Sequence, residues 1–257
     1  MQNPDNFPSD PLSKQTGEWP PLGPVATVPF SQGWQWLVDG FQLFKANPSQ
    51  WIAMTALYLV LMVALSVIPV LSLVSPILAP VFTGGLMLAC RRQDMTGQLD
   101  FRDLFAGFQQ KAGPLSLLGL IFLGLYLALG LVLALLGGGA FMQMGGMHPG
   151  QNPVLALQGV GFVVVLGLLL LVPILMAQWF APALVALHDV APWEACKLSL
   201  SACFRNSMPF LIYGGVLFLA AIIASVPAML GWLVLLPVMF ASVYVGYKDI
   251  FQVTRHG

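Results

Sequence analysis

Charge is scarce in this sequence. Only 8% of its 257 residues are Asp, Glu, Lys or Arg, while 58% are hydrophobic. Charged residues make up about a quarter of a soluble globular domain, so the composition excludes that class and indicates an integral membrane protein. The 10 basic and 10 acidic residues cancel, which leaves no positive excess to attract nucleic acid. We expect the lipid bilayer to be the main partner, together with other membrane proteins or further copies of the chain, and no nucleic acid.

Lysine and arginine are absent from three long tracts, residues 46–90, 112–196 and 206–247. Basic residues bound each tract on both sides. Because basic residues mark the cytoplasmic side of a membrane protein, each tract leaves that side and returns to it, and therefore contains an even number of crossings. The sequence predicts a multi-pass protein with both termini in the cytoplasm.

The length of the tracts predicts the number of crossings. A helix needs about 20 apolar residues to cross the hydrocarbon of a bilayer, so each tract has room for a pair of helices. We predict an all-α protein whose six transmembrane helices form three hairpins, the first and third with tight turns and the second with a Gly-rich far-side loop. The predicted helices cover residues 50–69, 72–90, 114–136, 159–180, 208–227 and 229–247, and the loop covers residues 137–158.

An amphipathic segment precedes each hairpin. Ser31 and Asp100 are suited to cap the first two segments, and Pro192 is suited to the first turn of the third. Aromatic residues recur at helical spacing on one face of each segment, which indicates helices that lie in the membrane interface. The predicted interfacial anchors are Trp34, Phe41, Phe44, Phe105, Phe108, Trp193 and Phe204.

The three units have similar sequences. Phe44-Lys45-Ala46-Asn47 before the first hairpin matches Phe204-Arg205-Asn206-Ser207 before the third, and each returning helix contains a proline followed by apolar residues. This pattern predicts three parallel repeats, at about 30–98, 99–191 and 192–257, related by a pseudo-threefold axis along the membrane normal. The alternative is that Leu-rich hairpins look alike and that short matches arise by chance.

Residues 1–29 contain seven prolines and no apolar core, so we do not expect a signal peptide there. We expect a Pro-rich cytoplasmic tail, disordered or extended, followed by a single membrane domain at 30–257. The three cysteines, Cys90, Cys196 and Cys203, fall on the predicted cytoplasmic side. A disulfide framework is not expected there, and we interpret these thiols as packing residues.

Five stretches of sequence can be considered together. They are Gly33-Trp34-Gln35-Trp36, Leu43-Phe44-Lys45-Ala46-Asn47-Pro48, Leu104-Phe105-Ala106-Gly107-Phe108, Trp179-Phe180-Ala181-Pro182-Ala183-Leu184-Val185-Ala186-Leu187-His188-Asp189 and Lys248-Asp249-Ile250-Phe251. Over roughly residues 30–252 the chain resembles an uncharacterised proteobacterial family of predicted integral membrane proteins. The resemblance implies a location in the bacterial inner membrane. The family has no established activity and no binding residues to carry over.

The predicted far-side loop contains Met142, Met144, Met147 and His148 within seven residues. Thioethers with one imidazole suit Cu(I), so these residues form a candidate metal site. The alternative is a flexible Gly-rich turn in a protein that has 12 methionines.

Catalytic groups are missing from the predicted membrane interiors, which contain no Asp, Glu, Lys, Arg or His. Because nucleophilic and acid–base catalysis need an activated group beside a base, we expect neither an enzyme nor a cofactor. We interpret His188 and Asp189, at the interface, as a helix-end charge pair. Two functions remain. One is a scaffold or accessory component that contacts lipids or membrane partners, and the other is a permease-like protein for a neutral solute or lipid.

Overall fold

The computed structural model describes residues 19–68, 74–145, 153–226 and 230–253. Within these ranges the secondary structure is helical and contains no strand, which confirms the predicted all-α class. The elements in chain order are α1 (Gln32–Ala46), α2 (Pro48–Val67), α4 (Ser75–Thr96), the 3₁₀ helix η1 (Phe101–Phe105), α5 (Ala106–Gln110), α6 (Ala112–Gly145), α7 (Pro153–His188), α8 (Pro192–Arg205), α9 (Ser207–Ser225) and α10 (Trp232–Ile250).

The starts of the short helices follow the local sequence, with one exception. Pro192 opens α8, where its missing N–H costs no hydrogen bond. Asp100 caps η1 by accepting from the backbone nitrogen of Arg102, and Asp103 accepts in return from the backbone nitrogen of Asp100. Ser31 stands at the N-cap of α1 as predicted, but its side chain makes no capping hydrogen bond. Its backbone carbonyl, rather than its hydroxyl, serves the first turn.

Five of the described helices are long and apolar enough to cross a membrane. They are α2, α6, α7, α9 and α10. The predicted count of six is therefore not confirmed, because α4 does not meet this standard. It begins at Ser75 rather than at residue 72, and its last turns carry Arg91, Arg92 and Asp94. Most of its middle is buried against neighbouring helices, so α4 faces protein more than it would face lipid.

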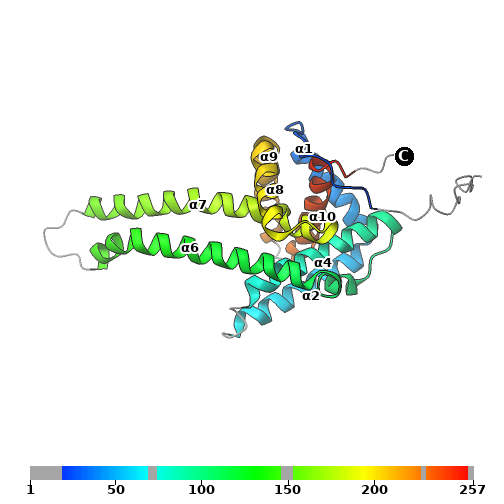
Figure 1. Ribbon diagram of the computed structural model, residues 1–257, viewed down its shortest axis with the longest axis horizontal. Helices are drawn as coiled ribbons and strands as arrows, with labels where there is room; N and C mark the ends of the chain where they lie inside the picture. The colour runs from blue at the N-terminus through cyan, green and yellow to red at the C-terminus, as the bar shows by residue number, and fades with distance from the viewer. Residues whose placement is uncertain (1–18, 69–73, 146–152, 227–229, 254–257) are drawn as a thin grey trace, which may run out of the picture.

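The second hairpin is much longer than the sequence predicted. α6 has 34 residues and α7 has 36, so each is about 50 Å long, against roughly 30 Å of bilayer hydrocarbon. The two helices pack side by side and project far beyond the other helices (Figure 1). The prediction of a Gly-rich loop over residues 137–158 is wrong, because most of these residues are helical. Helix continues to Gly145 and resumes at Pro153, because the apolar runs persist on both sides and support further turns.

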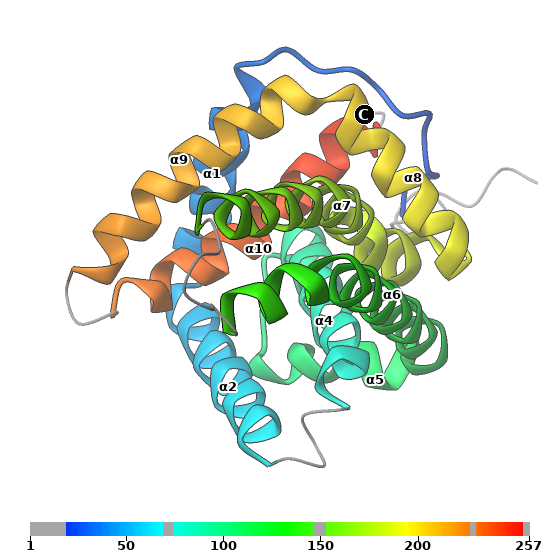
Figure 2. The same cartoon turned by 90° about the vertical axis from the view of Figure 1, so that its left-hand side faces the viewer.

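The other two hairpins are open rather than tight. α2 packs on α10 and η1 more than on α4, and α9 packs on α1 more than on α10. Figure 2, which looks along the α6–α7 hairpin, shows α2 leading away in one direction and α9 with α10 in another. The helices therefore splay from a common region instead of forming a parallel bundle.

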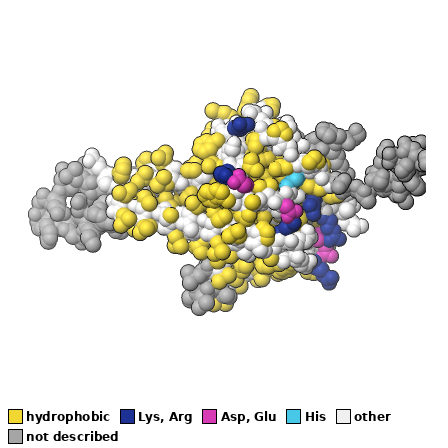
Figure 3. Space-filling view, viewed as in Figure 1, with side chains coloured by type: hydrophobic (Ala, Val, Ile, Leu, Met, Phe, Trp, Pro, Cys, Tyr) yellow, Lys and Arg dark blue, Asp and Glu magenta, His cyan; other side chains and the backbone are white. Residues whose placement is uncertain are grey.

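That common region, which we call the base, is where the C-terminal halves of α4, α7 and α10 meet. Met87, Leu184 and Tyr247, one from each helix, are fully buried there. Away from the base the helices expose apolar side chains, among them Leu127 of α6 and Leu211 of α9. Figure 3 shows hydrophobic side chains along the projecting hairpin and most charged ones around the base. This division is typical of helices that meet lipid beyond a packed, charged end.

Candidate functional site

The three amphipathic segments surround the base. α1 packs on α10, η1 and α5 pack on α4, and α8 packs on α7. Each segment also contacts the other long helix of the same pair: α9 for α1, α2 for η1, and α6 for α8. Each segment thus lies on the helix pair that precedes it, and α1 at the start of the chain joins the pair at its end. We call this closed arrangement of α1, η1 with α5, and α8 the amphipathic ring.

Two glycines allow the ring to approach the long helices closely. A Cβ atom on Gly40 of α1 would lie 2.7 Å from the backbone nitrogen of Ser242 in α10. A Cβ on Gly107 of α5 would lie 2.1 Å from the carbonyl oxygen of Val81 in α4. Atoms cannot approach so closely, so both contacts require the absence of a side chain.

A serine has the corresponding place in the third contact. The Ser199 hydroxyl of α8 donates to the carbonyl oxygen of Met176 in α7 at 2.7 Å. The same hydroxyl accepts from the backbone nitrogen of Phe180 at 2.9 Å. Ser199 is fully buried, and its hydroxyl bonds a carbonyl and an amide of α7 between Pro173 and Pro182, which lie inside that helix.

The predicted interfacial anchors fall into two groups. Trp34, Phe41, Trp193 and Phe204 are 54%, 42%, 56% and 58% exposed. Phe44 is buried, and Phe105 and Phe108 lie edge-on to Phe82 of α4 with centroids 6.2 and 4.9 Å apart. The first group is available to lipid or to a partner, whereas the second group anchors the ring to the base.

Charged side chains at the ends of the long helices bind the ring. Asp249, at the end of α10, accepts hydrogen bonds from Nε1 of Trp36 at 2.9 Å and from Nε2 of Gln32 at 3.1 Å. Arg92, near the end of α4, pairs with Asp103 of η1 at 2.6 Å. These contacts fix α1 on α10 and η1 on α4.

A second set of contacts joins the ends of the long helices to one another. Asp94 of α4 accepts from the Tyr244 hydroxyl at 3.0 Å and pairs with Lys248 at 2.6 Å, both from α10. Nε1 of Trp51 donates to Oε1 of Gln93 at 2.8 Å inside the protein. Spacing alone did not single out Trp51 or Gln93. Their partners lie more than forty residues away along the chain, so no local pattern reports them.

His188 and Asp189 do not form the predicted charge pair. Asp189 pairs with Lys111 instead. Nε2 of His188 lies 2.9 Å from the carbonyl oxygen of Pro20, and Nδ1 is hydrogen-bonded to the Tyr247 hydroxyl. A carbonyl can only accept, so Nε2 carries the proton, and Nδ1 of the neutral ring accepts from Tyr247.

The N-terminal segment at residues 19–28 is extended and lies across the ends of α7, α8 and α10 (Figure 1). The backbone nitrogens of Gly23 and Ala26 donate to the carbonyls of Phe251 and Ile250 at 3.0 and 2.8 Å. Of the two conformations predicted for the tail at 1–29, residues 19–29 adopt the extended one and are held in place. Residues 1–18 lie outside the described ranges.

Asn206 and Trp19 attach this segment further. Asn206, fully buried at the α8–α9 junction, accepts from the backbone nitrogen of Val28 at 2.9 Å and donates to the carbonyl of Ala26 at 3.0 Å. Trp19 packs against His188, with ring centroids 6.0 Å apart. The matching junction sequences pointed to Asn206, but only the fold shows what it binds.

The cysteines are buried and free. In α8, burial raises the pKa of Cys196 to about 11 and the pKa of Cys203 to about 12. Thiols with such values remain protonated at neutral pH and are poor nucleophiles and poor metal ligands.

The candidate copper residues lie largely beyond the described part of the chain. Met142 and Met144 belong to the last turns of α6, where only the backbone is described, and Met147 and His148 lie outside the described ranges. Across the ranges that are described, no group of three or more His, Cys, Asp or Glu is placed to hold a metal ion. The Met-rich site therefore stays a prediction.

Comparison with known proteins shows that the chain is similar to a bacterial membrane protein. A protein of Burkholderia thailandensis named "Probable inner membrane protein" is 32% identical over 254 residues, which cover 88% of this chain and 93% of the relative. No family model matches the chain. No solved structure matches it.

Proposed function

Because the chain belongs to the same family of bacterial inner-membrane proteins as this Burkholderia relative, we propose that it is a non-catalytic component that organises lipids and membrane partners. The amphipathic ring and the N-terminal segment are its contact surfaces. The observation that carries the proposal is the exposure of large aromatic side chains on the ring, beside the charged ends of the long helices. Tryptophan and phenylalanine on amphipathic helices bind the boundary between headgroups and acyl chains.

The proposed topology has six crossings and cytoplasmic termini. The basic residues at the base support this orientation, because they gather on one side of the apolar helices. Whether α4 crosses is the critical point. Alkaline phosphatase fused after position 71, 145 or 228 is expected to be active, and fusions after position 98 and at the C-terminus are expected to be inactive. Activity at both 71 and 98 would remove α4 from the crossings, and activity at the C-terminus would contradict a cytoplasmic C-terminus.

The proposed repeat is a cyclic one. The order of a short amphipathic segment followed by two long helices occurs three times, and each segment packs on the preceding pair. Gly40, Gly107 and Ser199 each lie where a segment contacts the second helix of the preceding pair. Such an arrangement supports a pseudo-threefold ring that closes when α1 reaches α10.

The second candidate function, a permease for a neutral solute or lipid, has less support. Two pairs of polar side chains join long helices: the Tyr126 hydroxyl donates to Oε1 of Gln178 at 2.6 Å, and the hydroxyls of Tyr213 and Ser242 lie 2.7 Å apart. These groups therefore hold helices together rather than line a path.

Photo-crosslinking in living cells tests the proposed function. The photoreactive residue p-benzoylphenylalanine replaces Trp34 or Trp193, both exposed, and as a control Trp36, which is buried on the same helix as Trp34. We expect adducts with phospholipid or with a discrete protein from the two exposed positions and only internal crosslinks from position 36. Equal yields at all three positions would contradict a ring that contacts lipids or partners.

A further inference from the structure

α9 and α10 touch at both ends and separate in the middle. At the base, the hydroxyls of Tyr213 and Ser242 meet inside the protein. At the far end, Nε1 of Trp232 donates to the Ser225 hydroxyl at 3.1 Å. These contacts fix the positions of the two helices at both ends, and a groove lies between them.

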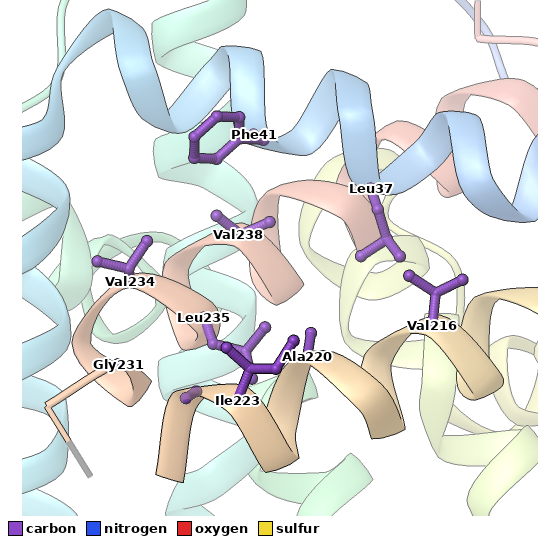
Figure 4. Close-up of a pocket in the computed structure, with 10 residues that line it drawn as sticks. Leu37, Phe41, Val216, Ala220, Ile223, Gly231, Val234, Leu235 and Val238 are labelled. Atoms are coloured by element: carbon purple, nitrogen blue, oxygen red, sulfur yellow. The ribbon is translucent and has the colours of Figure 1, made fainter. Parts of the chain in front are cut away.

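α1 borders the gap and makes it a groove. Figure 4 shows Leu37 and Phe41 of α1 pointing toward side chains of α9 and α10 across the space. The groove has a volume of about 450 Å³, which lies within the roughly 300–1,000 Å³ of typical ligand sites. Its lining is apolar and includes Leu37, Phe41, Val216, Ala220, Val234 and Val238.

The dimensions of the groove suit an acyl chain of one bilayer leaflet. Along α9 it runs from Val216 to Ala224, which is about 12 Å of helix, and one leaflet contributes roughly 15 Å of hydrocarbon. Ala220 and Ala224 are small, so the wall of α9 is hollowed where a chain would lie.

A basic residue stands beside the groove, one helical turn beyond Phe41 on α1. Nζ of Lys45 lies 5.1 Å from the centroid of the Phe41 ring, which lines the groove. Lys45 follows Leu37 and Phe41 at intervals of four residues, so all three share one side of α1. Asp39 lies on the opposite side and accepts from Gln35. Among the described residues no carboxylate forms an ion pair with Lys45.

We propose that the groove between α1, α9 and α10 binds one phospholipid, with an acyl chain against Ala220 and the phosphate at the Lys45 ammonium. This inference deepens the proposed function and rests on it, because it requires α1 to lie at the membrane surface. The charge of Lys45 favours an anionic headgroup over a zwitterionic one.

Titration with dioleoyl phosphatidylglycerol tests the proposal. The full chain is purified in detergent, and bound lipid is measured by native mass spectrometry. Ala220→Trp fills the groove and is expected to lower the affinity for the lipid roughly tenfold or more, because the acyl chain can no longer enter. Lys45→Gln is expected to lower affinity about fivefold, the effect of one basic group near a lipid phosphate. Val216→Phe is a milder filling variant in case Ala220→Trp does not fold.

Two control variants carry the same kind of substitution at positions outside the groove. Ile222→Trp places the same indole side chain on the opposite, exposed side of α9, and Lys197→Gln removes an exposed lysine of α8. Both are expected to bind lipid like the natural chain. Equal affinity in the filling variants and Ile222→Trp, or in the two lysine variants, would overturn the proposal. If the lipid titration fails in this way, crosslinks from positions 34 and 193 would show that the proposed contact function stands without the lipid site. If those crosslinks are also absent, both the lipid site and the proposed function fail.

Discussion

Replacing Asn206 by alanine is expected to release the N-terminal segment from the base. The Asn206 side chain makes three hydrogen bonds, to the backbone nitrogen of Val28 at 2.9 Å and to the carbonyls of Ala26 and Ala202 at 3.0 Å each. Two of these bonds hold the N-terminal segment, and the third belongs to the end of α8. Because Asn206 is fully buried, water does not replace them while the segment stays in place.

The magnitude follows from the number of bonds. At about 1 kcal/mol for each hydrogen bond, the two bonds to the segment contribute about 2 kcal/mol, which corresponds to roughly a 30-fold change in the population of the open segment. The total effect on the free energy of unfolding is about 3 kcal/mol when the bond to Ala202 is included. Asn47, at the matching junction before α2, makes one exposed hydrogen bond to Gly97 at 3.1 Å. Asn47→Ala is therefore the control and is expected to change stability by no more than about 1 kcal/mol.

Hydrogen exchange of the Val28 amide in detergent-solubilised protein measures this opening. Protection at Val28 is expected to fall roughly 30-fold in Asn206→Ala and to stay unchanged in Asn47→Ala. Limited proteolysis after residue 19 is expected to be faster in Asn206→Ala than in Asn47→Ala or the natural chain. If protection at Val28 were equal in the natural chain and in Asn206→Ala, the segment would be held by other contacts and the reasoning would be wrong.

Three further predictions concern packing and burial. Gly107→Ala is expected to lower thermal stability in detergent by at least about 1–3 kcal/mol, because its Cβ would overlap the carbonyl of α4; Gly113→Ala, with open space around it, should not, and equal melting temperatures would refute the close contact. Cys196 and Cys203, with pKa values of about 11 and about 12, are expected to resist maleimide at pH 7.5 and to react faster as pH rises toward those values; rapid labelling of the folded protein at pH 7.5 would contradict their burial. Deleting residues 1–28 is expected to lower the melting temperature by about 5 °C through loss of the contacts at the base, and an unchanged melting curve would count against them.

Much of the helical structure could be predicted, because helices in lipid follow from local apolar length. The tract from 206 to 247 held enough apolar residues for two helices, and α9 and α10 lie there. The loop at 137–158 was wrong, since glycine weakens a helix but does not end one that has a packed neighbour. The crossing predicted at 72–90 is not confirmed, although the helix α4 lies there. Its prolines and charged last turns are tolerated because other helices surround it, and a window of sequence does not report that.

The candidate site was predicted only in part. The aromatic pattern indicated amphipathic segments, but it could not separate Trp34, which is exposed, from Phe44, which is buried. Both lie on the same apolar face of α1, and the partner helix α10 is about 200 residues away in the chain. The groove was not predicted at all, since it results from how far α9 and α10 diverge.

The sequence by itself determined that this chain is an all-helical membrane protein with its charge confined to short blocks, because the cost of placing charge in hydrocarbon acts on each residue wherever it lies. The tertiary structure alone decided which helices meet at the base, how the amphipathic ring closes through α1 and α10, and where a groove remains. Those features depend on contacts between residues far apart in the chain, such as Gly40 with Ser242 and Asn206 with Val28. Packing selects among many pairings that the local pattern allows equally.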